Sequence, residues 1–189
     1  MNLELTIGLD VISSYKRLAY TPWHAIAEFV DNSTQSYFDH RKELDKAFAE
    51  DDDKLKVAIV YERDQKGGLM RISDNAMGMS YNELRHALHV AKPPANTSGR
   101  SKYGMGLKTA SCWIGDLWSI RTKKLGETNE YKVTIDVEKI ATAGNNELPV
   151  IVKEKSADQH YTIIEITKHN RSFHGIWWIR LFRVENGSK

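Results

Sequence analysis

Two strand-like segments separated by a glycine turn do most to limit the folds open to this chain. Residues 54–62 and 68–73 are rich in β-branched and other apolar side chains, and Gly67 and Gly68 lie where they meet. Glycine tolerates the backbone angles of tight hairpin turns, so these two segments are predicted to pair as antiparallel strands. Three later segments, listed by residue number, are also strand-like: 116–124, 129–137 and 160–168.

A helix is predicted before these strands. Thr21 can cap free amide groups, and Pro22 is preformed for the first helical position, so we expect a helix over residues 22–32 that could extend to residue 50. Ahead of it, apolar residues alternate from Leu3 to Leu9, which suggests a short strand or extended arm before a helical stretch near Asp10.

Two more helices are predicted between the strands. Ser80 and Glu83 have the spacing of a capping box and introduce a helix over residues 81–91. A polar stretch follows and is interpreted as a lid, and another helix is expected to begin after Gly104 and end at Ile114. Helices that precede strands in this way are typical of a two-layer α+β domain.

Composition fits one compact domain with a buried core. The chain has 189 residues, of which 41% are hydrophobic and 28% charged, and its formal net charge is only +2. This charge predicts no general attraction to nucleic acid or membrane; Arg121, Lys123 and Lys124 could form a basic patch, but a solvated face is the favoured interpretation.

Cysteine content and hydropathy bear on the cellular setting. Cys112 is the single cysteine, so neither an internal disulfide nor a cysteine zinc motif is expected, and a reducing cytoplasmic setting fits. The amino terminus lacks a basic region followed by a long apolar run, and no apolar stretch approaches membrane-spanning length. We expect no membrane contact.

The first group of residues with chemical potential is Glu28 and Asn32. Four residues apart on the predicted helix, they share one face, where an amide oxygen could coordinate magnesium and a carboxylate could activate a nearby water. The alternative, two ordinary solvent-facing polar residues, stays open on this evidence.

The second group follows a predicted strand, at residues 74–79. A buried Asp74 could accept a hydrogen bond from the exocyclic amine of adenine, whereas a guanine carbonyl would face it acceptor to acceptor. A surface turn rich in Asp, Asn and Gly is the alternative.

The third group opens a predicted helix, at residues 102–108. Gly104 and Gly106 would allow close backbone approach to a phosphate, the helix start favours anions, and Lys102 and Lys108 could add positive charge. A tight turn before a buried helix is the alternative.

In this order, the segments AEFVDNS, SDNAMGMS and KYGMGLKTAS resemble the three boxes of the GHKL ATPase superfamily, which includes gyrase, mismatch-repair MutL, heat-shock chaperones, histidine kinases and MORC proteins. HYTIIEI, with Thr162, resembles the fourth motif. The resemblance implies a Bergerat fold: an α/β sandwich with a mixed, mostly antiparallel sheet, helices on one face and a mobile lid over ATP. It divides the chain into an ATP-binding domain at residues 1–170 and an unassigned tail at 171–189.

The resemblance also implies residue roles. Glu28 matches the water-activating base, Asn32 the magnesium ligand and Asp74 the adenine-binding aspartate. The nucleotide-binding residues implied are Asn32, Asp74, Gly78, Met79, Lys102, Tyr103, Gly104, Met105, Gly106, Leu107, Lys108 and Thr162. Two positions depart from the motifs: Ala76 replaces a glycine of the second box, and Tyr161 stands where the fourth often has glycine.

The implied function is magnesium-dependent ATP binding with slow hydrolysis to ADP and phosphate. Histidine kinases usually carry Asn where Glu28 stands, so Glu28 favours hydrolysis over phosphotransfer, and the Gly-Leu-Lys ending of the third box is most similar to MORC and related prokaryotic ATPases. ATP would close the lid and promote homodimerisation as a switch that acts on DNA or a partner protein. An ATP-binding module without turnover, or a GHKL-type kinase, remains the alternative.

Overall fold

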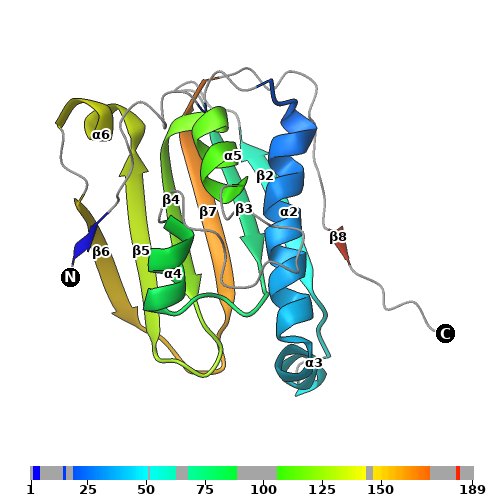
Figure 1. Ribbon diagram of the computed structural model, residues 1–189. Coiled ribbons are helices and arrows are strands. Elements are labelled where there is room, and N and C mark those ends of the chain that lie inside the picture. The colour runs from blue at the N-terminus through cyan, green and yellow to red at the C-terminus, as the bar shows by residue number, and fades with distance from the viewer. Residues whose placement is uncertain are drawn as a thin grey trace.

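The chain forms one antiparallel sheet with helices packed on one face. The computed structural model describes residues 2–4, 15, 19–50, 52–62, 68–88, 106–143, 147–170 and 182–183. The eight strands lie in the order β1-β6-β5-β4-β7-β3-β2-β8, and the pairings among the described strands are antiparallel. Helices α2, α4 and α5 lie in front of the sheet (Figure 1). The predicted α+β class with a mostly antiparallel sheet is confirmed, and no parallel pair is found in the described part.

The helices begin and end as follows: α2 at Pro22–Asp39, α3 at Arg41–Glu50, α4 at Tyr81–Leu88, α5 at Gly106–Ile114 and α6 at Val137–Ala143. The strands are β1 at Asn2–Glu4, β2 at Lys56–Glu62, β3 at Leu69–Asp74, β4 at Gly115–Lys123, β5 at Asn129–Asp136, β6 at Glu147–Glu154, β7 at Tyr161–His169 and β8 at Phe182–Arg183.

Helix α2 begins where its sequence predicts. The Thr21 side chain accepts a hydrogen bond from the His24 amide, and proline occupies the first turn. The helix ends at Asp39, and after a break at His40 the separate helix α3 continues to Glu50. The predicted extension to residue 50 is therefore two helices rather than one.

The capping box before α4 is also confirmed. The Glu83 carboxylate accepts from the Ser80 amide at 2.7 Å, and the Ser80 hydroxyl accepts from the Glu83 amide at 3.3 Å. The predicted pair of strands around the glycine turn is β2 with β3, in antiparallel register from Val57 opposite Asp74 to Glu62 opposite Leu69. The three later predicted strands are β4, β5 and β7.

The sequence analysis did not predict β6, α6 or β8. Strand β6 pairs with β5 and, through Glu147–Pro149, with β1, which confirms the strand expected at the amino terminus over Asn2–Glu4. Strand β8 pairs with β2 through Phe182 and Arg183, within the segment left unassigned. The expected helical stretch near residue 10 and the lid at residues 93–103 lie outside the described residues.

The core lies between the helices and the sheet. Phe29 of α2 and Trp113 of α5 are at most 2% exposed and pack over sheet residues such as Ile120 and Ile166. Each such side chain contributes roughly 1.5–3 kcal/mol through removal from water. Helix α2 packs along α5, so the two helices that carry the first and third motifs are held together.

The basic run does not form a solvated face. Lys123 is fully buried, and its ammonium donates to the backbone carbonyls of Lys124, Glu127 and Gln159. Lys124 pairs with Glu83 at 2.6 Å. Lys123 and Lys124 therefore connect the end of β4 to neighbouring segments, through contacts with residues that are in part distant in sequence.

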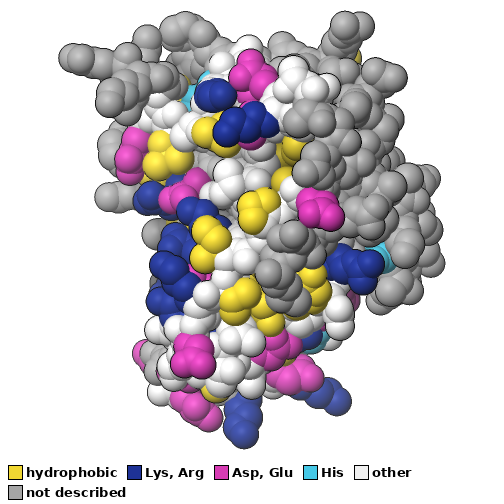
Figure 2. Space-filling view, turned by 90° about the vertical axis from the view of Figure 1, so that its left-hand side faces the viewer, with side chains coloured by type: hydrophobic (Ala, Val, Ile, Leu, Met, Phe, Trp, Pro, Cys, Tyr) yellow, Lys and Arg dark blue, Asp and Glu magenta, His cyan; other side chains and the backbone are white. Residues whose placement is uncertain are grey.

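Figure 2 views the β6 side of the molecule, where hydrophobic side chains are visible among charged ones. In strand β6, Ile151 is 53% exposed and Val152 is 42% exposed, and the next two residues, Lys153 and Glu154, are exposed and charged.

Within the described ranges, none of the helices combines the length and apolar character needed to cross a membrane.

Candidate functional site

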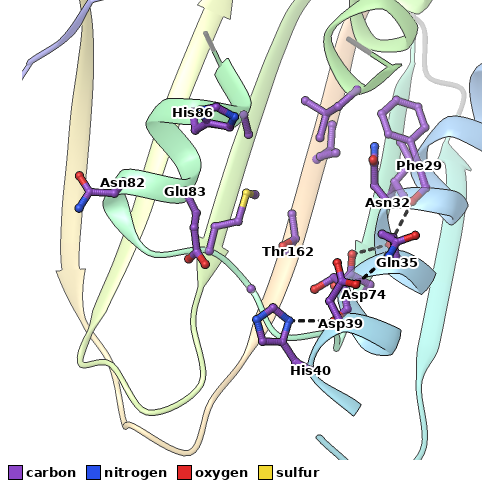
Figure 3. A pocket seen from close by; sticks show the side chains of 18 residues that line it. Phe29, Asn32, Gln35, Asp39, His40, Asp74, Asn82, Glu83, His86 and Thr162 are labelled. Carbon is purple, nitrogen blue, oxygen red and sulfur yellow. Dashed lines mark hydrogen bonds between the residues drawn. The ribbon is translucent and has the colours of Figure 1, made fainter. Parts of the chain in front are cut away.

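A cavity of about 510 Å³ lies between helices α2 and α4 over the sheet. This α2–α4 cavity is within the usual size range of small-molecule sites. Figure 3 shows Asn32, Gln35 and Asp39 on the α2 side with Asp74 next to them, Glu83 and His86 on the α4 side, and Thr162 between the two sides. The lining residues are Phe29, Asn32, Ser33, Gln35, Ser36, Asp39, His40, Ile72, Asp74, Gly78, Met79, Asn82, Glu83, His86, Ala87, Leu107, Thr162 and Ile164.

Asp74 is the partly buried acid of the cavity. It ends β3, and its carboxylate accepts hydrogen bonds from the Ser33 hydroxyl at 2.6 Å and the Ala76 amide at 3.0 Å. Burial raises the pKa of Asp74, and the bonds from Ser33, Ala76 and the Thr162 amide, with the charge of His160, oppose that rise. The cavity therefore contains a partly desolvated carboxylate that can accept a further hydrogen bond from a ligand.

Thr162 lies beside Asp74 because β3 and β7 pair in register at these two residues. Its hydroxyl is 3.2 Å from that of Thr122 on β4, and the Thr122 hydroxyl accepts from the Met79 amide at 2.8 Å. This chain of hydroxyls joins the second and fourth motifs through a residue that neither contains.

Gly78 is required by its surroundings. Its φ of +71° is in the left-handed region, and a Cβ there would lie 1.9 Å from the backbone oxygen of Lys123. Gly78 and Met79 both line the cavity, so the close approach of this loop to β4 shapes the site.

Ala76 requires no such conformation. Among the described non-glycine residues, positive φ angles occur at Asp52 and Lys168, so the replacement of glycine by Ala76 places no side chain at a positive φ. Its side chain is 1% exposed and packs with Tyr37, Leu44 and Phe48. Alanine at this position therefore serves a small apolar cluster outside the cavity lining.

Tyr161 likewise points away from the cavity. Its hydroxyl donates to the Glu130 carboxylate on β5, and burial together with that bond raises the pKa of Tyr161 to about 12. Neighbouring strand residues point to opposite faces, so Thr162 lines the cavity and Tyr161 packs on the other face. This departure from the motif leaves the cavity wall unchanged.

The candidate base, Glu28, meets the start of α5. A Cβ on Gly106 would lie 1.9 Å from Glu28 Oε2, so the absence of a side chain at Gly106 is what admits the carboxylate. The Tyr20 hydroxyl donates to Glu28 Oε1 at 3.4 Å. Glu28 is not among the described residues that line the cavity, but Leu107, the neighbour of Gly106, is.

Asn32 lines the cavity one turn beyond Glu28 on α2, as their spacing predicts. Magnesium in phosphate sites is usually held by one or two side-chain oxygens together with phosphate oxygens and water. The described residues contain no cluster of three or more His, Cys, Asp or Glu that could hold a metal by themselves. The Asn32 amide oxygen is suited to a site in which one side-chain oxygen, phosphate oxygens and water hold the magnesium together.

Lys108 differs from the other predicted phosphate residues. Its side chain is 3% exposed, it is not among the described lining residues, and burial lowers its pKa to about 8. Gly106 and Leu107 lie at the helix start as predicted, whereas Lys102, Tyr103, Gly104 and Met105 lie outside the described residues.

Sequence reasoning missed Ser33, Thr122 and Tyr20. Ser33 and Thr122 act on motif residues about 40 positions away, and Tyr20 precedes the first motif, so no local spacing indicates them. Ser33 stands directly after Asn32 in the first motif, which is the one signal that could have drawn attention to it.

Comparison with known proteins agrees with this arrangement. Residues 20–170 match a family model described as histidine kinase-, DNA gyrase B-, and HSP90-like ATPase. No curated protein gave a match to the sequence. The matched range contains every motif that forms the cavity.

Proposed function

We propose, from the premise that this chain belongs to the histidine kinase-, DNA gyrase B- and HSP90-like ATPase family, that it binds ATP with magnesium and hydrolyses it slowly. The observation that carries the proposal is the α2–α4 cavity, which is lined by the partly buried Asp74 carboxylate and by Leu107 from the first turn of α5. The cavity thus offers one acceptor for a base and one helix start for an anion.

Adenine is the base that suits Asp74. Its exocyclic amine donates a hydrogen bond, and a carboxylate drawn partly out of water accepts such a bond more strongly than a neutral oxygen does. Thr162 lies beside the carboxylate, while Phe29, Ile72 and Ile164 provide apolar surface for a flat ring.

The phosphates would lie toward α5. A helix start presents free amide groups and the positive end of the helix dipole, and the carboxylate of Glu28 lies beside that start at Gly106. Asn32 would hold magnesium through its amide oxygen, and that ion would supply neutralisation of phosphate charge.

Glu28 is the proposed base for hydrolysis. Its carboxylate lies against Gly106, close to where the phosphates would end, and there it could accept a proton from the attacking water. Tyr20 would orient the carboxylate through its hydrogen bond. Most of the catalysis would come from positioning and charge neutralisation.

Two finer statements belong to the same proposal. ATP would act as a conformational switch that promotes a homodimer, as the MORC-like third motif implies, and the switch would act on a protein or DNA partner. A module that binds ATP without turnover is a second candidate. It is favoured by one observation, the absence of Glu28 from the cavity lining within the described chain.

Glu28→Gln tests the hydrolytic assignment. The amide keeps the size of the side chain but cannot accept a proton, so phosphate release should fall roughly 100- to 10,000-fold while the Kd for ATP stays within a few-fold. The matched control is Glu43→Gln, an exposed carboxylate of α3. Wild-type turnover in Glu28→Gln would remove Glu28 from catalysis, and ATP binding without phosphate release in the wild type would favour the second candidate.

A further inference from the structure

We infer that Ser33 is a positioning residue for base recognition, because its hydroxyl holds Asp74 as an acceptor for the 6-amino group of adenine. The inference rests on the proposed ATP binding and adds a residue to it. Ser33 of α2 is 4% exposed, lines the cavity and is hydrogen-bonded to Asp74.

The hydroxyl of Ser33 has two possible acceptors and one hydrogen. Its oxygen is 2.6 Å from Asp74 Oδ2 and 3.1 Å from the Phe29 carbonyl oxygen. The shorter distance is typical of a hydroxyl bound to an ionised carboxylate. A carboxylate is a stronger acceptor than a carbonyl oxygen, so the shorter contact assigns the hydroxyl hydrogen to Asp74.

The acceptor positions of Asp74 are nearly all used. A carboxylate offers about four lone-pair positions. The Ser33 hydroxyl and the amides of Ala76 and Thr162 occupy three of them, which leaves one for a ligand. One remaining acceptor suits the single amine hydrogen that adenine can direct at this point.

Removal of the Ser33 hydroxyl would change which group on the base Asp74 can bind, a hydrogen-bond donor or an acceptor. Burial favours the neutral carboxyl, and the Ser33 bond is the first of the interactions that oppose it. A neutral carboxyl carries a hydrogen and can donate it to a ring carbonyl. Loss of the Ser33 hydroxyl should therefore weaken binding of a purine with an amine at position 6. It should also reduce the discrimination against a purine with a carbonyl at that position.

Other charged groups share this space. The charge of His160, just before β7, acts on Asp74. Asp39 and His40 line the cavity at the end of α2, and Glu83 and His86 line it from α4. A substitution at Ser33 leaves all five in place. The comparison of variants at one pH therefore isolates the Ser33 contribution.

A ligand-by-residue cycle tests the inference. Calorimetry would give Kd values for ATP, for purine riboside triphosphate, which lacks the amine, and for inosine triphosphate, which has a carbonyl in its place. Wild type should prefer ATP over purine riboside triphosphate by about tenfold or more, as the loss of a hydrogen bond to a charged acceptor predicts. In Ser33→Ala this preference should fall to roughly threefold or less, and inosine triphosphate should gain relative to ATP.

The control is Thr34→Val. Thr34 is the next hydroxyl on α2, its bond goes to the Asp31 carbonyl at 3.1 Å, and it does not line the cavity among the described residues. It should keep the wild-type preference. Ser33→Cys, which fills the site but donates weakly, should lose preference as Ser33→Ala does and gives a second variant if alanine impairs folding.

Equal weakening of all three ligands by Ser33→Ala and Ser33→Cys would overturn the inference and leave Ser33 a purely structural role. A wild type that binds none of the nucleotides would instead overturn the proposed function. The experiment therefore distinguishes failure of the Ser33 inference from failure of the proposed ATP binding.

Discussion

Removing a carboxylate from water lowers the stability of the protein when no nucleotide is bound. Burial raises the pKa of Asp74 above its value in the unfolded chain. A group of this kind stabilises the fold fully below its unfolded pKa, and that contribution is lost as pH rises through the folded pKa. At neutral pH Asp74 therefore lowers the free energy of unfolding, as many functional groups do.

Asp74→Asn should expose this cost. We expect the variant to unfold at a higher temperature than wild type at pH 7, with the difference shrinking as pH falls, because the amide carries no charge to bury. Thermal unfolding of both proteins without nucleotide, across a pH series, measures it. ATP affinity of the wild type should weaken as pH falls through the Asp74 pKa.

Asp53→Asn provides a control of opposite sign. Hydrogen bonds from Lys56, Lys54 and Asn75 outweigh desolvation and lower the pKa of Asp53. Its contribution is present above the unfolded pKa and lost as pH falls through the folded one. Asp53→Asn should therefore be less stable than wild type at pH 7, and an Asp74→Asn variant that is also less stable there would contradict the account.

The sequence could identify the residues that carry local motifs. Asp74, Gly78, Met79, Asn32 and Thr162 all line the cavity that the structure contains. It could not identify the partners that set their properties, since Ser33 lies 41 residues from Asp74 and Thr122 lies 40 from Thr162. Those pairings exist only after β3, β4 and β7 have assembled.

At the scale of elements, the loop between β3 and α4 is docked on the end of β4. The Leu125 amide donates to the Met77 carbonyl at 3.1 Å, and the Met79 amide donates to Thr122 Oγ1 at 2.8 Å. Gly78 lies between these bonds against the Lys123 carbonyl. The loop therefore reaches the cavity only because Gly78 has no side chain.

Gly78→Ala should destabilise the fold by at least about 2 kcal/mol, because it combines strain at positive φ with a backbone clash. The control is Gly126→Ala: Gly126 has a similar φ of +81° but nothing within 4 Å of an added Cβ, so only strain of about 1 kcal/mol is expected. Denaturant unfolding measures both. Equal destabilisation in the two variants would show that the contact with β4 contributes nothing.

Element starts were more predictable than element ends or edges. The Thr21 cap and the Ser80–Glu83 box act within a few residues, so local chemistry specifies them. Strand β6 contains Pro149, which local propensity disfavours, and that residue lies opposite Asn2 at the end of the short pairing with β1. The break at His40 between α2 and α3 has no proline or glycine to announce it.

For the whole molecule, the sheet order explains how distant motifs form one site. Strand β7 is inserted between β4 and β3, so Thr162 meets both Thr122 and Asp74, and α2 lies across from α4 over them. Spacing along the chain does not predict this order, and the resemblance to a known family predicted only a mostly antiparallel sheet with helices on one face. Magnesium binding, dimerisation, the lid and the division at residue 170 stay predictions.

Magnesium-dependent ATP binding by the wild-type chain is the most direct test of the central claim. Calorimetry with ATP and magnesium should show saturable binding, at least about tenfold weaker when a chelator removes the metal and undetectable at millimolar ATP for Asp74→Asn. A wild type that shows no magnesium-dependent binding at millimolar ATP, or an Asp74→Asn variant that binds as wild type does, would contradict the account.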